Sequence, residues 1–305
     1  MTSVETKETA PRRPGATWLT LSLGVLRACR PKQWIKNVLV IAAPGTAGVL
    51  LSPHVVLDVG LAFVAFCLAA SGTYLINDAV DVEADRRHPE KRHRPIAAGI
   101  VPVPLAIGVG VGCVIASLGV SALTFSWRLP ATMVGYLVLT TAYTVWLKHI
   151  VVVDLVGVAA GFVLRALAGA AAAGVMVSDW FLIVASLGSL FMVAGKREAE
   201  LRGQPDGATR ATLEAYSHSY LSYVRAMSSG ATIVTYCLWA LSHQGEGGWC
   251  FFLSIVPFAL AILRYAMLID SGSGESPEAI VLRDRHLQVY GVLLIILVAI
   301  GIYAI

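Results

Sequence analysis

The sequence predicts an all-α integral membrane protein with about nine transmembrane helices. Hydrophobic residues make up 57% of the chain, only 14% of residues are charged, and the mean hydropathy is +0.73. A soluble domain of this length carries about a quarter charged residues, so this much apolar surface needs a bilayer as its solvent. The basic residues lie in short connections between apolar segments. Membrane lipids are therefore the expected surroundings, and no nucleic-acid partner is expected.

The helices are predicted from apolar segments, because a spanning helix needs roughly 20 such residues. Nine segments qualify, at about 34–52, 55–76, 100–122, 131–147, 150–174, 179–195, 222–242, 249–269 and 287–305. Pro44 and Gly45 predict a kink inside the first of these segments.

The orientation follows from the placement of lysine and arginine, which favour cytoplasmic connections. Of 23 such residues, only Arg128 falls in an outside connection when the N-terminus is placed in the cytoplasm. This predicts a multi-pass protein of the plasma membrane whose C-terminus lies outside. Residues 1–26 are predicted to be a disordered cytoplasmic tail, followed by one transmembrane catalytic domain at 27–305. The long polar loops are cytoplasmic, so we expect the active site there.

Acidic side chains gather where the second apolar segment ends. If the helix continues, Asp78, Asp81 and Asp85 fall within roughly 60° of one another on one face. Hard oxygen ligands that leave room for water and phosphate favour Mg²⁺, with Asn77 orienting or ligating. The alternative is a solvated helix end. Against it, basic residues follow at once and would suit a diphosphate: Arg86, Arg87, Lys91, Arg92 and Arg94.

Arg165 lies well inside the fifth apolar segment, where an unpaired charge is expensive and usually functional. Asp154 lies on the same face, but about 16 Å away, so the two cannot be in contact. Each must find its own partner. An anionic substrate would serve Arg165, and the alternative is an acid from another helix.

Several segments resemble the UbiA-type intramembrane prenyltransferases. The opening Arg30-Pro31-Lys32-Gln33-Trp34-x-Lys36-Asn37 is similar to the start of that family, and the Asn77–Asp85 cluster with Arg94-Pro95 resembles its first aspartate-rich motif. The resemblance implies a helix bundle around a central cavity open to the cytoplasm. Most members carry a second aspartate-rich motif, but this chain reads Lys196-Arg197-Glu198-Ala199-Glu200-Leu201 there. A second metal site of the usual kind is therefore not expected.

Together with the opening segment, four others are similar to the phosphoribosyltransferase branch of the family: His88-Pro89-x-Lys91-x-x-Arg94-Pro95, Leu147-Lys148, Gly161-Phe162-x-Leu164-Arg165 and Lys196-Arg197-x-x-Glu200-Leu201. That resemblance implies Mg²⁺-dependent transfer of 5-phosphoribosyl from phosphoribosyl diphosphate to decaprenyl phosphate or another polyprenyl phosphate, feeding the synthesis of cell-wall arabinan in arabinogalactan. Asp78, Asp81 and Asp85 would bind the metal. The side chains expected to hold substrate are Lys36, Lys91, Arg94, Lys148, Arg165, Lys196, Arg197 and Tyr143. Tyr216, Tyr220 and Tyr223 recur at helical spacing, which is typical of an interfacial aromatic belt.

Two other functions remain open from the sequence. A prenyltransferase with a prenyl diphosphate donor would use the same aspartates, although the basic pair Lys196-Arg197 argues for a second phosphate-bearing substrate. A transporter would place its site near the bilayer midplane at discontinuous helices, whereas most charges here crowd one face. A homo-oligomer is compatible with such a bundle, but no segment predicts an interface.

Overall fold

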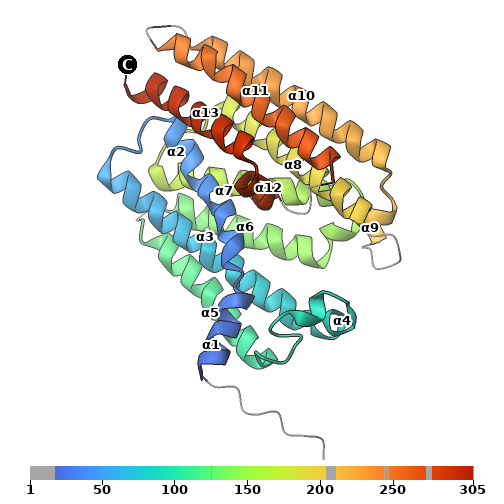
Figure 1. Ribbon diagram of the computed structural model, residues 1–305. Coiled ribbons are helices and arrows are strands. Elements are labelled where there is room, and N and C mark those ends of the chain that lie inside the picture. Colours follow the sequence, from blue (N-terminus) through green and yellow to red (C-terminus); the bar gives the residue numbers. More distant parts are fainter. Residues whose placement is uncertain are drawn as a thin grey trace, which may run out of the picture.

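The computed structural model (Figure 1) describes residues 18–124, 126–203, 211–243, 245, 247–272 and 277–304. Every regular element within these ranges is helical, as predicted. The α-helices and the 3₁₀-helices, labelled η, follow in this order: α1 (Trp18–Ala28), η1 (Pro31–Ile41), α2 (Ala42–Thr46), α3 (Pro53–Val80), α4 (Val82–Arg87), η2 (Lys91–His93), α5 (Val103–Ala122), α6 (Arg128–Val145), η3 (Leu147–His149), α7 (Val153–Ala173), α8 (Asp179–Gly203), α9 (Ala211–Glu214), α10 (His218–Ser242), α11 (Gly248–Asp270), α12 (Pro277–Arg283) and α13 (Arg285–Tyr303).

Six of the described helices, α3, α5, α7, α8, α11 and α13, are long and apolar enough to cross a bilayer. The chain is therefore a multi-pass membrane protein. The segments expected at 131–147 and 222–242 are also helical, as α6 and α10, but these two do not meet the same criterion. Length and apolarity thus identify six candidate spans among the described residues and leave the predicted number of nine unconfirmed.

The first expected span, 34–52, differs most from the prediction. The chain forms eleven residues of 3₁₀-helix in η1, turns α-helical at Ala42, and leaves the helix after Thr46. The change of geometry therefore precedes Pro44 and is not a kink within one long helix. A 3₁₀ run of this length is uncommon, because its hydrogen bonds are poorly aligned, and it needs support from neighbouring helices. Asn37 and Val40, both fully buried, provide the contacts.

Part of the segment predicted as a disordered tail is helical. Residues 1–17 lie outside the described part of the chain, whereas residues 18–26, assigned to the tail from sequence, belong to helix α1. Gly24 and Ala28 on α1 are buried, and the side chains of Ile100 and Val101 lie against Gly24. The short helix is ordered because its apolar face packs on the segment before α5.

Most of the polar connections lie at one end of the bundle, which we call the polar end. The helices α3, α6, α8 and α11 finish there, and α4, η2, η3, α9 and α12 occupy it (Figure 1). Two helices that start there have side-chain caps: Ser217 accepts a hydrogen bond from the Tyr220 backbone N–H, and Asp284 accepts one from that of Leu287. The caps fix where α10 and α13 leave the polar end.

At the opposite end, the last helix contacts the first elements of the bundle. The Tyr303 hydroxyl donates to the Gly45 carbonyl at 3.2 Å and accepts from the Leu50 N–H at 3.3 Å. The Leu50 N–H lies beyond α2 and has no backbone partner among the described residues, so this side chain satisfies a polar group that a bilayer would leave without one. The Gly45 carbonyl, in α2, also accepts from the Gly48 N–H at 3.3 Å. The bundle is thereby closed between α13 and α2.

Close backbone contact joins η1 to α7. A Cβ atom at Gly169 would lie 1.7 Å from the Val40 carbonyl oxygen and 2.6 Å from its carbon. Only glycine fits, because the obstructing atoms are backbone and cannot rotate away. This contact sets the position of the 3₁₀-helix that precedes the site described below.

We expect Gly169→Ala to destabilise the folded protein by about 3 kcal/mol, because the added methyl forces η1 away from α7. Thermal unfolding of the detergent-solubilised protein would measure the loss. Gly135→Ala on α6 is the matched control, since no atom lies within 4 Å of its added Cβ. An unchanged melting temperature for Gly169→Ala would contradict the close approach.

Candidate functional site

Two carboxylates at the polar end are almost fully buried. Asp78 lies in the last turn of α3 and Asp85 lies in α4, and each is 4% exposed. The hydrogen-bond ladder passes through Asp81, whose N–H donates to the Asn77 carbonyl and whose carbonyl accepts from Asp85 N–H. Asp81 itself adopts φ −86° and ψ 10°, outside the helical range.

Arg30 and Arg94 neutralise these two carboxylates. Arg30 Nη2 lies 2.7 Å and 2.9 Å from the two oxygens of Asp78. Arg94 Nη1 bridges the acids, at 3.0 Å from Asp78 Oδ1 and 2.7 Å from Asp85 Oδ2. Charge-assisted bonds of this kind are about twice as strong as neutral ones. The four side chains form what we call the carboxylate–arginine cluster.

The remaining members of the predicted metal site lie around this cluster. Asp81 is exposed and forms no ion pair with a described residue, and Asn77 donates to the Thr144 hydroxyl at 3.4 Å. Among the described residues, no three His, Cys, Asp or Glu side chains converge as a metal site would require. Two carboxylates do converge on one cation position, however, and it is held by Arg94 Nη1. Magnesium is usually bound by one or two carboxylates, with water and substrate phosphate completing its coordination, so the donor set fits Mg²⁺.

A second charged cluster lies at the ends of α7 and α8. Arg197 pairs with Asp154 at 3.2 Å and Glu200 at 2.6 Å, and its Nη2 donates to the Tyr143 hydroxyl at 2.8 Å. Lys196 lies 3.7 Å from Glu200. Asp154 is thus paired with Arg197 and not with Arg165, in agreement with the predicted separation of about 16 Å between Asp154 and Arg165. The predicted phosphate-binding pair Lys196 and Arg197 is engaged with acids of the protein.

Tyr216 completes the second cluster and was assigned to an aromatic belt from its spacing. It is buried, precedes α10, and donates its hydroxyl proton to Asp154 while accepting from the Val152 N–H at 2.6 Å. Burial, and then the hydrogen bond to Asp154, raise the pKa of Tyr216 well above its ordinary value. The phenol therefore stays protonated and acts as a donor. Tyr220 and Tyr223 are exposed, as an interfacial position requires.

Helix α6 contacts the second cluster and Asn77, the residue next to Asp78. Thr144 accepts the hydrogen bond from Asn77, and its neighbour Tyr143 accepts the one from Arg197. Adjacent residues of α6 therefore contact Asn77, in the first acidic motif, and Arg197, in the basic segment that takes the place of a second one. The predicted site residues of α3, α6 and α8 are brought to one region at the polar end.

Arg165 is buried among neutral partners. Its Nε donates to Asn37 Oδ1 at 2.8 Å, its Nη1 to the Gly161 carbonyl at 2.7 Å, and its Nη2 to the Tyr136 hydroxyl at 2.8 Å. Its guanidinium also lies over the Tyr136 ring, 4.9 Å from the centroid. The expected alternative of an acid from another helix does not hold for the described residues. The charge remains uncompensated, and the contacts tie η1 to α6 and α7.

The other predicted substrate-binding lysines are more peripheral. Lys36 donates to Gln33 one turn earlier on η1. Lys91 is exposed in η2, and Lys148 is half-buried in η3, where its carbonyl accepts from Thr212. Neither Lys91 nor Lys148 forms an ion pair with a described residue.

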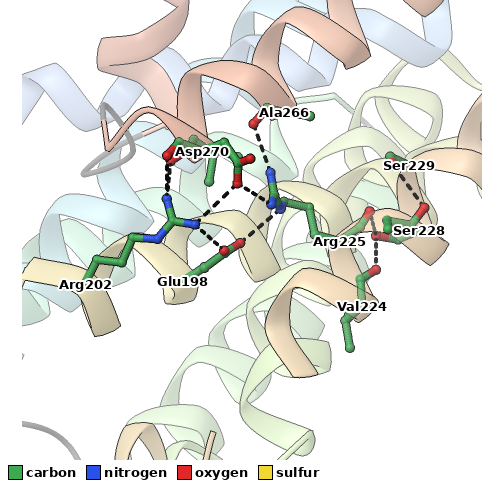
Figure 2. A network of polar contacts seen from close by, with 10 residues as sticks. Glu198, Arg202, Val224, Arg225, Ser228, Ser229, Ala266 and Asp270 are labelled. Atoms are coloured by element: carbon green, nitrogen blue, oxygen red, sulfur yellow. Dashed lines mark hydrogen bonds and ion pairs between the residues drawn. The ribbon is translucent and has the colours of Figure 1, made fainter. Parts of the chain in front are cut away.

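A third group of charges holds the helices behind the site. Figure 2 shows Arg202 and Arg225 approaching Glu198 and Asp270 from opposite sides. Arg202 contacts Glu198 at 2.6 Å, and Arg225 contacts Asp270 at 2.8 Å. Arg225 Nε also lies 3.0 Å from Glu198 Oε2, as an ion pair without hydrogen-bond alignment. These four side chains link α8, α10 and α11, and we call them the α8 clamp. One of them, Glu198, directly follows Arg197 in the sequence.

Together the fold and the site define a class: polytopic, all-helical membrane proteins that gather carboxylates and arginines at one end of the bundle. The chain belongs to the UbiA prenyltransferase family, whose profile matches residues 39–288.

Similar proteins agree with this placement. The decaprenyl-phosphate phosphoribosyltransferase of Corynebacterium glutamicum is 44% identical over 291 residues, which cover 93% of this chain and 88% of that protein. The protein of the same name from Mycobacterium tuberculosis is 48% identical over 278 residues, with 88% and 90% covered. Among solved structures, the UbiA homolog from Archaeoglobus fulgidus bound to DMAPP and Mg²⁺ superimposes with a TM-score of 0.70 at 19% identity, over 92% of this chain and 99% of that one. That likeness establishes the fold.

We expect Glu198→Gln to lower the free energy of unfolding by about 3 kcal/mol, because it leaves two arginines without their buried anion. Thermal or denaturant unfolding in detergent would measure it. Glu83→Gln breaks the exposed pair with Arg86 at 2.7 Å and serves as the control, which should change stability by less than about 0.5 kcal/mol. Equal effects of the two substitutions would show that the α8 clamp has no special role.

Proposed function

We propose that this protein transfers a 5-phosphoribosyl group from phosphoribosyl diphosphate to decaprenyl phosphate, or a similar polyprenyl phosphate, and releases diphosphate. The observation that carries the proposal is the identity of 44% and 48%, over most of the chain, to proteins named decaprenyl-phosphate phosphoribosyltransferase. The basic pair Lys196-Arg197, in place of a second aspartate-rich motif, supports a reaction between two phosphate-bearing molecules.

The donor is a water-soluble anion and the acceptor is a lipid, so the site must lie at a membrane boundary. The bias of lysine and arginine supports a cytoplasmic polar end with the N-terminus inside and the C-terminus outside. The polyprenyl chain stays among membrane lipids, because it gains nothing by entering water. The helical bundle from residue 27 onward acts as one catalytic unit, and no step requires a second copy of the chain.

In the reaction, the bond between the ribose C1 and the diphosphate oxygen breaks, and its electron pair leaves with diphosphate. An oxygen of the lipid phosphate forms the new bond to C1. The nucleophile is already anionic, so no strong general base is needed. A bound Mg²⁺ supplies charge neutralisation for the leaving diphosphate. Asp78, Asp81 and Asp85 would hold it, and Asn77 would orient or ligate, with Asp81 contributing an exposed carboxylate.

The phosphates are held by basic side chains of the polar end and the bundle interior. Arg165 has three of its five N–H groups engaged with neutral partners, which leaves two for an anion and its full charge uncompensated. Tyr143 steadies Arg197. The side chains assigned to substrate are Lys36, Lys91, Arg94, Lys148, Arg165, Lys196, Arg197 and Tyr143.

The donor and acceptor can be tested directly. Purified protein in lipid should make a lipid-linked product from labelled phosphoribosyl diphosphate and decaprenyl phosphate, and chelation of divalent metal should stop it. A panel of prenyl diphosphates with aromatic acceptors should give no product. Prenyl transfer in that panel would favour the ordinary prenyltransferase, and substrate flux across proteoliposomes without a covalent product would favour a transporter.

Asp81 separates a catalytic effect from a structural one. Because its side chain is exposed and unpaired among the described residues, Asp81→Asn should leave the melting temperature unchanged. It should lower kcat about 100-fold or more, since one metal ligand is weakened. Glu83→Gln, an equally exposed acid two residues later, is the control and should keep wild-type turnover. Full activity in Asp81→Asn would remove this residue from the metal site.

A further inference from the structure

Arg30 and Arg94 cover two of the three acids that are proposed to hold the metal, Asp78 and Asp85. The side chains of Arg30 and Arg94 are 30% and 28% exposed, whereas those of Asp78 and Asp85 are each 5% exposed. An ion arriving from the polar end therefore meets two guanidinium groups before it meets Asp78 or Asp85. Arg30 was not among the residues that sequence reasoning assigned to the site.

The four charges of the cluster cancel. Two carboxylates contribute −2 and two guanidinium groups contribute +2. A free divalent cation would enter a neutral site and would have to displace bonds of 2.7 Å, leaving both arginines half-buried without an anion. A divalent cation that arrives with a diphosphate brings new acceptors for both arginines.

We infer that Arg30 and Arg94 are built-in counter-ions that pass from the carboxylates to the substrate diphosphate, so that metal and diphosphate bind together and not in sequence. This inference deepens, and rests on, the proposed function at the same site. The arginines hold Asp78 and Asp85 in place while the site is empty of substrate. They then bind the oxygens of the diphosphate, and the carboxylates become available to the metal.

The geometry of Arg30 supports such a transfer. Its backbone adopts φ 55° and ψ 60°, a left-handed conformation that is unfavourable for a residue with a side chain. Such conformations cluster at ligand-binding and switching positions. Pro31 follows directly, and the Tyr74 ring lies 4.6 Å from the guanidinium carbon. The backbone is thus set at the corner between α1 and η1, and the side chain can change its anion by rotating over the Tyr74 ring.

Arg94 is placed with similar firmness. Its N–H donates to the Lys91 carbonyl at 2.9 Å, and its carbonyl accepts from the Ala98 N–H at 2.8 Å. Ile96, two residues later, is buried in the core with Ala28 of α1. Both arginines therefore extend from fixed backbones to the same oxygen, Asp78 Oδ1, and a diphosphate beside it would receive two guanidinium groups at once.

The experiment measures metal binding and diphosphate binding separately. Mn²⁺ alone, followed by electron paramagnetic resonance, reports the metal affinity of the purified full-length protein without substrate. Retention of labelled inorganic diphosphate at saturating Mg²⁺ reports the anion. Arg30→Gln and Arg94→Gln are compared with wild type, and Arg283→Gln, an exposed arginine of α12, controls for the loss of one positive charge.

We expect each cluster variant to bind Mn²⁺ about tenfold more tightly than wild type, because a competing cation has been removed from Asp78. The same variant should bind diphosphate about tenfold more weakly. Arg283→Gln should change neither affinity by more than about twofold. Opposite changes in the two affinities are the expected signature, since a loss of structure would weaken both.

Unchanged or weaker Mn²⁺ binding in both cluster variants would overturn the inference, as would equally tight Mn²⁺ binding by wild type with and without diphosphate. Melting temperatures identify a variant that fails to fold. In that case the Mn²⁺ and diphosphate affinities of the other arginine variant decide the test. Failure of wild type to bind phosphoribosyl diphosphate, with inorganic diphosphate still bound, would overturn the proposed substrate alone. The Mn²⁺ comparison does not depend on that substrate.

Discussion

Two carboxylates buried side by side at a membrane boundary require cations, and Arg30 and Arg94 provide them. Removing Asp78 and Asp85 from water costs several kcal/mol for each ion, and only close pairing offsets this cost. The requirement fixes more than four side chains. It draws the corner between α1 and η1 to the end of α3, and it draws the loop before α5 to the same point. The shape of the polar end therefore follows from charge compensation.

The same rule explains why α8 has a defined rotation. Arg197 and Glu198 are adjacent, so their side chains point about 100° apart. Arg197 contacts Asp154 of α7, whereas Glu198 contacts Arg225 of α10. On one side α8 contributes the cation of an ion pair with α7, and on the other it contributes the anion of an ion pair with α10. The basic pair Lys196-Arg197 is thereby held in one orientation, because the neighbouring α8 clamp resists rotation of the helix.

Composition and apolar spacing were sufficient to predict an all-helical membrane fold and the approximate place of its helices, because burial in lipid demands these features. They could not predict that η1 is a 3₁₀-helix, since hydropathy is the same for both helix types. The acids at 77–85 were recognisable from their spacing. The arrangement was only partly predictable, because the helical spacing assumed an unbroken helix, and the backbone leaves the helical range at Asp81. Arg30 and Tyr216 reach their partners through contacts distant in sequence, which no local pattern encodes.

The contact between Tyr303 and the backbone at Gly45 and Leu50 joins the final turn of α13 to α2 and to the connection that follows it. Synthesis proceeds from the N-terminus, so α2 is inserted long before α13 exists. The Leu50 N–H must stay hydrated, or bound to another molecule, until α13 has been synthesised. Completion of the bundle is therefore a late event in biogenesis, and the C-terminus takes part in it.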